Sequence, residues 1–291
     1  MNAIMPKLTL NNGITLDAVG FGVYRSAPAE TTVAVETALA NGYRLIDTAA
    51  AYHNETEVGA ALAQSGVDRA ELFITTKLWV DDYGYDSALR AFDASMARLG
   101  LDVLDLYLLH QPLPSDFQAT IASWQALQTL YEQGRVRAIG VSNFSTAELG
   151  DLLARSDVVP AVNQIQVHPY FSEPELRSFN LENGILTEAW SPIGGVTRYW
   201  KHGSGAAPKD PLHDPVIVGI AAAHHKTPAQ VILRWEIQLG ICVIPKSVTP
   251  KRIAENIDLF DFSLSAEELS SISALDTGIR SGPEPDTITR G

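Results

Sequence analysis

Short apolar runs of strand type alternate with helical patterns through most of this 291-residue chain. Eight such runs are present, at residues 19–23, 43–47, 72–77, 103–110, 136–141, 161–167, 185–190 and 241–244. Eight strands that alternate with helices are typical of a closed (β/α)8 (TIM) barrel of the α/β class. An open doubly wound sheet is the alternative. No Gly-x-Gly-x-x-Gly follows the first run, however, which disfavours the dinucleotide-binding form of that fold.

Two additions to the barrel are predicted near the ends of the chain. Asn11-Asn12-Gly13 separates two β-type runs within residues 7–16, a strong signal for an N-terminal β-hairpin. Extra helices are expected near the C-terminus, at residues 215–225 and after the eighth strand, where Ser265 and Glu268 form a capping box. The composition is 46% hydrophobic and no compositional break divides the chain, so we expect one domain over residues 1–291.

Composition also restricts the partners and the compartment. The formal net charge of -13 argues against binding to nucleic acid or to anionic membrane surfaces. No apolar run approaches the roughly 20 residues that span a bilayer, and the first ten residues do not resemble a secretory signal. The single cysteine, Cys242, excludes an internal disulfide, and its apolar neighbours indicate a core residue rather than a nucleophile. We therefore expect a cytoplasmic protein.

Polar side chains stand at the ends of three consecutive predicted strands. Asp47 ends the second strand, Lys77 the third and His110 the fourth, while Tyr52 follows Asp47 after a loop of small residues. Each residue alone has an ordinary explanation: a loop cap, a solvated charge or a core histidine. Barrel enzymes keep their catalytic groups at the C-terminal ends of strands, and barrel order makes these strands neighbours. The coincidence therefore indicates a catalytic set.

Reduction of a carbonyl group is the chemistry that suits this set. A carbonyl that accepts hydride develops negative charge on oxygen and needs a proton, which Tyr52 could donate. The unperturbed pKa of tyrosine is about 10. A buried Lys77 ammonium, held in place by Asp47, is expected to lower that pKa. His110 would orient the carbonyl, and the hydride must come from a cofactor.

A basic segment after the eighth strand is the best candidate for holding that cofactor. Residues 244–252 contain three cations and two hydroxyl groups and lead into a helix whose N-terminal amides favour phosphate. A solvated basic turn is the alternative for the same residues. Trp190, at the end of the seventh strand, could offer its face to a nicotinamide ring or could simply pack at the barrel end. The seven histidines are scattered without zinc-ligand spacing, so no metal is expected.

Motifs along nearly the whole chain resemble those of the aldo-keto reductases, NADPH-dependent (β/α)8 enzymes, and most closely the bacterial 2,5-diketo-D-gluconate reductase branch. They lie at residues 42–54, 73–79 (Phe-Ile-Thr-Thr-Lys-Leu-Trp), 139–144 (Ile-Gly-Val-Ser-Asn-Phe), 160–169 and 245–256. The resemblance implies NADPH-dependent reduction of aldehydes, ketones or diketones. It implies that Tyr52 donates the proton and that Lys77 and Asp47 adjust the acidity of Tyr52. It also implies that His110 orients the carbonyl. It also implies a monomer that acts on a small molecule.

The resemblance further implies residues that hold NADPH or NADP+. These are Ser142, Asn143, Gln164, Trp190, Ser191, Lys246, Ser247, Val248, Arg252, Glu255 and Asn256. The implied substrate pocket contains Tyr24, Trp79, His110 and Gln111. Gln111 replaces a tryptophan of many relatives, the loop at residues 195–214 is longer than in the closest branch, and the tail from Asp276 is short. A catalytically idle, cofactor-binding subunit of the same fold, with a redox-sensing or interaction role, is the main alternative. A barrel lyase or isomerase that uses Lys77 as a Schiff-base nucleophile is a further one.

Overall fold

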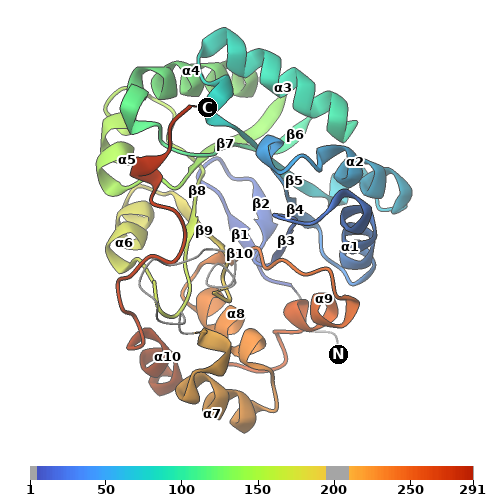
Figure 1. Ribbon diagram of the computed structural model, residues 1–291, viewed down its shortest axis with the longest axis vertical. Helices are drawn as coiled ribbons and strands as arrows, with labels where there is room; N and C mark the ends of the chain where they lie inside the picture. Colours follow the sequence, from blue (N-terminus) through green and yellow to red (C-terminus); the bar gives the residue numbers. More distant parts are fainter. Residues whose placement is uncertain (1–4, 195–209, 291) are drawn as a thin grey trace.

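Eight parallel strands form one sheet that curls into a barrel, with helices around its outside (Figure 1). The structure is a computed structural model, which describes residues 5–194 and 210–290. The strands are β3 (Gly20–Gly22), β4 (Leu45–Asp47), β5 (Phe73–Leu78), β6 (Leu104–Leu109), β7 (Val136–Ser142), β8 (Val162–Gln166), β9 (Leu186–Trp190) and β10 (Cys242–Val243). A parallel bridge between Val19 and Val243 joins the first strand to the last. The predicted (β/α)8 barrel is confirmed, and each predicted run overlaps one of these strands, with ends that agree to within two residues.

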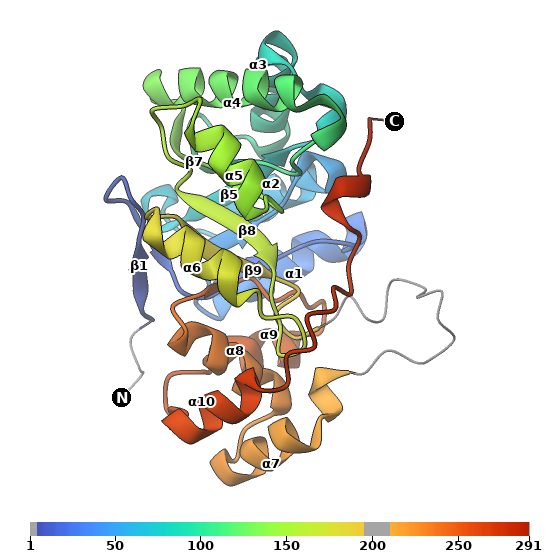
Figure 2. The same cartoon turned by 90° about the vertical axis from the view of Figure 1, so that its left-hand side faces the viewer.

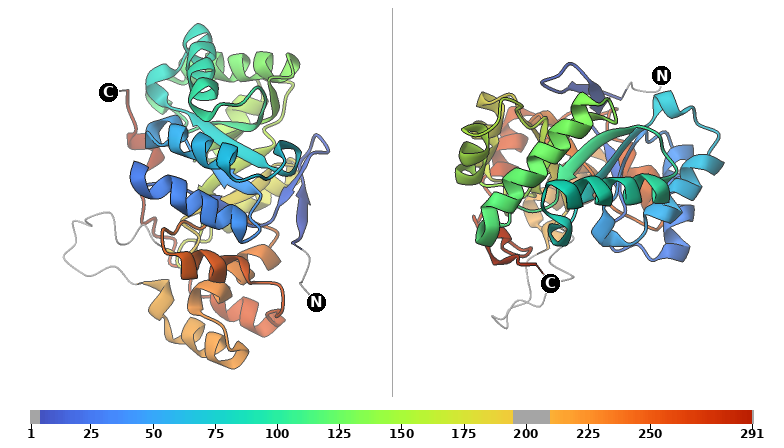
Figure 3. Two further views of the ribbon diagram at one scale, coloured as in Figure 1. Left: turned by 90° about the vertical axis from the view of Figure 1, so that its right-hand side faces the viewer. Right: turned by 90° about the horizontal axis from the view of Figure 1, so that it is seen from above.

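The helices surround the barrel in the predicted order. They are α1 (Pro28–Ala40), α2 (Glu55–Gln64), α3 (Tyr85–Leu99), α4 (Phe117–Glu132), α5 (Thr146–Leu153), α6 (Pro174–Glu182), α7 (Pro215–His224), α8 (Pro228–Gln238), α9 (Pro250–Ile257) and α10 (Ala266–Ser273). Ser265 and Glu268 form the predicted capping box of α10. Helices α7, α8 and α10 share an apolar cluster that includes Ile217, Trp235 and Ile272, and they lie together at the lower end of the left view in Figure 3. Within the described residues, no helix is long and apolar enough to cross a membrane.

The two ends of the barrel are covered by different parts of the chain. The predicted N-terminal hairpin is confirmed as β1 (Lys7–Thr9) and β2 (Thr15–Asp17), an antiparallel pair. Its turn closes the N-terminal end of the barrel, where the side-chain amide of Asn12 donates to the carbonyl of Arg137 at 3.0 Å. The C-terminal tail crosses the opposite end, and the amide of Gly282 donates to Gln166 Oε1 at 3.0 Å (Figure 2). The hairpin therefore leaves the C-terminal ends of the strands to the tail and to the connecting loops.

Alternate strand residues fill the interior of the barrel. Leu45, Phe73, Leu106, Val162 and Cys242 belong to one buried apolar cluster, to which each contributes from a different strand. Because side chains alternate across a strand, the residue two positions further along each strand also faces inward. In β4, β8 and β9 that alternation carries polar side chains. An apolar layer therefore supports a polar layer nearer the C-terminal mouth.

Candidate active site

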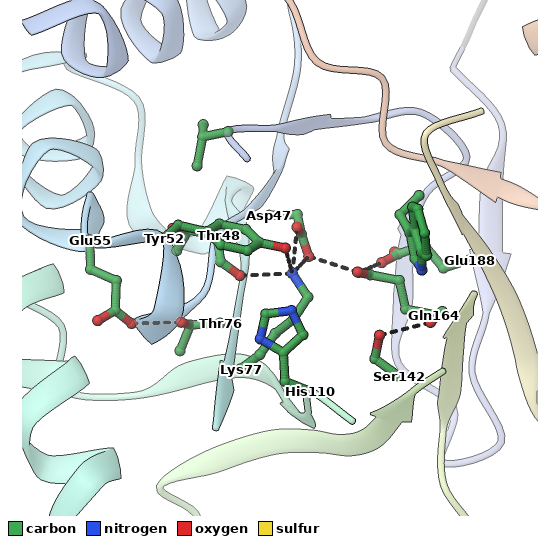
Figure 4. A network of polar contacts seen from close by, with 12 residues as sticks. Asp47, Thr48, Tyr52, Glu55, Thr76, Lys77, His110, Ser142, Gln164 and Glu188 are labelled. Atoms are coloured by element: carbon green, nitrogen blue, oxygen red, sulfur yellow. Dashed lines mark hydrogen bonds and ion pairs between the residues drawn. The ribbon is translucent and has the colours of Figure 1, made fainter. Parts of the chain in front are cut away.

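Lys77 and Asp47 form a buried ion pair at the ends of β5 and β4. The Lys77 Nζ lies 2.6 and 2.8 Å from the two carboxylate oxygens of Asp47 and donates to the carbonyl of Thr48 at 2.9 Å (Figure 4). The Lys77 side chain is fully buried, and Asp47 is 2% exposed. Burial raises the pKa of Asp47, while the Lys77 ammonium and the Gln164 amide act against that rise. The two strands thus hold a cation and an anion together out of water.

Tyr52 reaches this ion pair from a short loop. Its hydroxyl lies 3.3 Å from Lys77 Nζ, at the end of a 3₁₀ turn over Ala50–Tyr52. The buried Asn54 side chain fixes the loop, since it accepts from Thr48 Oγ1 at 2.9 Å and donates to the carbonyl of Val23 at 3.0 Å. The loop therefore carries the phenol over the ammonium, and the structure brings the predicted Tyr52 and Lys77 together.

The electrostatics of Tyr52 differ from the expectation drawn from the sequence. Burial, followed by the charge of Asp47, raises the pKa of Tyr52 well above 10. The expected net lowering of this pKa is wrong, because burial and the Asp47 carboxylate together outweigh the neighbouring Lys77 ammonium. A phenol with a raised pKa keeps its proton at neutral pH. Tyr52 is therefore protonated and able to donate.

His110 completes the predicted set of four. It follows β6 directly, and its ring packs edge-on against Tyr52 at 5.5 Å and against Trp79 at 5.1 Å between centroids. Burial, assisted by the charge of Lys77, lowers the pKa of His110 well below 6.5, so its imidazole is neutral at neutral pH. Its Nδ1 has no hydrogen-bond partner within the described residues. A neutral imidazole keeps one N–H donor, which a substrate oxygen can accept.

Four residues predicted to contact the nicotinamide form one connected group. Asn143 follows β7 with a left-handed φ of 65°, and its Nδ2 donates to the carbonyl of His110 at 3.0 Å. The indole of Trp190 donates to Asn143 Oδ1 at 2.9 Å. Ser142 Oγ donates to the carbonyl of Gln164 at 2.8 Å. Asn143 Nδ2 also donates to Ser142 Oγ at 3.0 Å, and Gln164 reaches Asp47, so these polar groups lie together beside the ion pair. Ser191, with a φ of 52°, follows Trp190 directly.

Glu188 belongs to the same group and was missed by the sequence analysis. Gln164 Nε2 donates to Asp47 Oδ2 at 2.8 Å and also to Glu188 Oε1. Burial, assisted by the charge of Asp47, raises the pKa of Glu188 to about 7. A signal was available, because Glu188 lies two residues before Trp190 in a predicted strand and hence on the same face. An acid inside a barrel strand could have been recognised on that ground.

The predicted phosphate-binding segment adjoins the same end of the barrel. The amide of Gly22 donates to the carbonyl of Pro245, and the next amide in the chain donates to the carbonyl of Asp47, both at 3.2 Å. Thr249 is the N-cap of α9 and makes no side-chain capping bond. Burial lowers the pKa of Lys246, with Glu30 acting against it. The remaining predicted residues are Ser247 (buried), Val248 (37% exposed), Arg252 (exposed), Glu255 (half-buried, near Lys251) and Asn256 (buried).

The predicted substrate residues are partly assembled around Tyr52. The ring of Tyr24 lies 5.0 Å from that of Tyr52, and Trp79 packs on His110, so these aromatic side chains line one wall. The backbone carbonyl of Gln111 accepts from the hydroxyl of Tyr83 at 2.5 Å. The Gln111 Oε1 atom is buried without a partner in the described part of the chain. The predicted long loop lies largely outside the described residues, at 195–209.

A barrel with this polar set at its C-terminal mouth has the architecture of an enzyme, because barrel enzymes carry their catalytic groups at that end. Residues 18–277 match the model of the aldo/keto reductase family, and the chain belongs to this family. The family and the enzyme class predicted from the sequence, an oxidoreductase, are therefore confirmed.

Similarity to known proteins extends over almost the whole chain. The chain is 54% identical over 283 residues to morphine 6-dehydrogenase of Pseudomonas putida, and the match covers 97% of this chain and 95% of that protein. It is 45% identical to glyoxal reductase of Bacillus subtilis, covering 98% of each chain. Among solved structures, a mutant of Gox0644 in complex with NADPH has a TM-score of 0.89 at 42% identity, covering 98% of this chain and 99% of that one.

Proposed function

We propose that this protein reduces aldehydes, ketones or diketones to alcohols with NADPH, and that Tyr52 is the general acid. The observation that carries the proposal is the phenol 3.3 Å from the buried Lys77 ammonium. The names of the relatives, a morphine dehydrogenase and a glyoxal reductase, support it, as does the NADPH complex of Gox0644. The resemblance of the sequence motifs to the 2,5-diketo-D-gluconate reductase branch favours small dicarbonyl compounds as substrates.

The residues present fit a phosphorylated nicotinamide dinucleotide. Asn143 and Gln164 offer side-chain amides at the mouth, and Trp190 is held there by its bond to Asn143. At the other side, the uncapped N-terminus of α9 and the side chains of Lys246 and Arg252 suit a phosphate. When bound, NADPH supplies the hydride.

The chain's own residues handle the proton and the oxygen. His110 would donate an N–H to the carbonyl oxygen and orient it. Tyr52 would transfer its hydroxyl proton to that oxygen as the alcohol forms. Lys77, fixed by Asp47, would stabilise the phenolate that remains on Tyr52. General acid catalysis of this kind contributes about 10²–10⁴-fold to the rate.

An assay with a panel of reactive carbonyls tests the proposal. Purified protein, NADPH and compounds such as glyoxal or a small diketone should give carbonyl-dependent oxidation of the cofactor. Tight NADPH binding without turnover of any carbonyl would instead support the idle-subunit alternative. The monomeric state, the single domain and the cytoplasmic location stay predictions.

Replacing Arg252 with alanine tests whether this residue recognises the 2′-phosphate of NADPH. Arg252 is exposed at the start of α9, and we propose that it pairs with the 2′-phosphate of NADPH. A charge-assisted hydrogen bond contributes about 1.5–3 kcal/mol, so the Kd for NADPH should rise roughly 10- to 100-fold. The Kd for NADH should hardly change. Fluorescence titration with both cofactors measures the difference.

Arg155 offers a matched control for this experiment. It is another exposed arginine, just beyond the end of α5. Arg155→Ala removes the same charge from a distant surface and should leave both dissociation constants unchanged. Equal losses for NADPH and NADH in Arg252→Ala would show that this residue does not distinguish the two.

A further inference from the structure

Glu188 is a fully buried carboxyl group on β9 that the mechanism above does not use. Two neighbouring strands flank it, with Gln164 of β8 and Cys242 of β10 directly opposite in the register. Gln164 Nε2 donates to Glu188 Oε1 and, at 2.8 Å, to Asp47 Oδ2. The thiol of Cys242 lies 3.5 Å from Glu188 Oε2. Glu188 therefore faces the polar layer of the active site rather than a separate part of the core.

The side-chain amide of Gln164 has two hydrogens, and both are directed at carboxyl groups. Since Asp47 and Glu188 accept them, Gln164 Oε1 is the part of the amide left to meet a ligand. A continuous chain of bonds then runs from Glu188 through Gln164, Asp47 and Lys77 to the hydroxyl of Tyr52 (Figure 4). A change in the charge of Glu188 at one end of this hydrogen-bonded series can therefore alter the acidity of the Tyr52 hydroxyl at the other end.

We propose that Glu188 is a positioning residue for the reduction: it fixes the Gln164 amide against Asp47 and couples its own charge to the strength of Tyr52 as an acid. The proposal rests on the proposed function. Glu188 does not reach the reacting atoms in this account, because it acts through Gln164 and Asp47.

The charged and titratable groups around Glu188 set the direction of the effect. Asp47 and Lys77 face it across the barrel, and the Cys242 thiol also lies against the carbonyl of Asp17. Burial and the charge of Asp47 raise the pKa of Glu188 to about 7. Above that pH a second negative charge enters the buried cluster, and this charge raises the pKa of Tyr52 further. Tyr52 therefore becomes a weaker acid as pH rises through about 7.

The pH profile of hydride transfer tests the coupling. In single turnovers with NADPH and a reactive carbonyl, the wild-type rate should fall about threefold or more as pH rises through the ionisation of Glu188. Glu188→Gln should lose this decline and keep the wild-type rate at low pH, because its amide oxygen can still accept from Gln164. A decline that persists unchanged in Glu188→Gln would overturn the coupling. His110 cannot cause the decline, since its pKa lies well below 6.5.

Glu236 provides the matched control. It is also a fully buried glutamate, but it lies on α8, and Arg177 is the charge that acts on it. Glu236→Gln should keep the wild-type pH profile. If this variant also loses the decline, the effect comes from any buried carboxyl group and the proposal fails.

Glu188→Leu separates orientation from charge. Leucine leaves one N–H of Gln164 without an acceptor, so NADPH binding and the transfer rate should each weaken about tenfold relative to the wild type at low pH, and the rate should show no decline as pH rises. Glu188→Gln should restore both to near the wild-type values, which a simple packing role would not require. Equal behaviour of the two variants would contradict the positioning of Gln164.

Unfolding measurements distinguish failure of this inference from failure of the proposed function. Folded Glu188 has a pKa of about 7, against 4.5 ordinarily, so the folded state retains a proton that the unfolded state loses. The contribution of this proton to the free energy of unfolding is complete below about pH 4.5 and is lost as pH rises to about 7. Glu188→Gln should lack this pH dependence. If the wild type and Glu188→Gln show the same pH dependence of unfolding, the inference about Glu188 is overturned, but the proposed function is not. A wild-type protein that shows it but reduces no carbonyl overturns the proposed function and, with it, the coupling.

Discussion

Replacing Tyr52 with phenylalanine is expected to lower kcat for carbonyl reduction about 10²–10⁴-fold, which is the usual contribution of a general acid. Phenylalanine keeps the ring that packs against Tyr24 at 5.0 Å and His110 at 5.5 Å, and it removes only the hydroxyl beside Lys77. The Kd for NADPH should therefore change by less than about twofold, far below the effect on rate. Steady-state rates and fluorescence titration of the cofactor measure the two quantities.

Tyr85→Phe is the control for the loss of a phenol. The hydroxyl of Tyr85 is hydrogen-bonded to Thr129 Oγ1 at 3.0 Å on the outer surface and lies outside the site. That variant should keep the wild-type kcat and Kd. Turnover of Tyr52→Phe at the wild-type rate would mean that another group donates the proton, and the mechanism would have to be abandoned.

The fold could be predicted because its signals are local. Most strands fall within short, largely apolar runs, and the turn at Asn12-Gly13 fixes the hairpin without reference to the rest of the chain. The limits of the elements depend on distant partners. The sequence predicts that the second strand begins at Tyr43, but β4 begins at Leu45, and the Tyr43 hydroxyl donates to the carbonyl of Ile253, 210 residues further along the chain. No local pattern contains that contact.

The position of the proposed catalytic residues could also be predicted from the sequence, whereas that of the residues around them could not. Asp47, Lys77 and His110 end consecutive strands, so sequence order alone predicts their proximity. The bond from Gln164 to Asp47 joins residues 117 positions apart, on strands four places apart in the sheet. These residues meet only because the sheet closes into a barrel. The role of Glu188 and the raised pKa of Tyr52 follow from that closure and from the resulting burial.

Replacing Lys77 with methionine is expected to affect stability and activity together. Methionine fills a similar volume, but it leaves the Asp47 carboxylate buried without the cation that now lies 2.6 Å away. Breaking a buried ion pair in this way costs about 3–5 kcal/mol in the free energy of unfolding. Carbonyl reduction should also fall sharply, because no ammonium remains to stabilise the Tyr52 phenolate. Denaturant unfolding and kcat measure the two effects.

The double variant Lys77→Met/Asp47→Asn separates the two effects. Asparagine removes the uncompensated charge and still offers an oxygen to Gln164 Nε2, which now donates to Asp47 at 2.8 Å. Most of the lost stability should therefore return, since a neutral pair is often tolerated where a single buried charge is not. Turnover should not return, because the ammonium beside Tyr52 is still missing. A double variant as unstable as Lys77→Met would show that the ion pair is not the source of the loss, and recovered turnover would show that Tyr52 does not need Lys77.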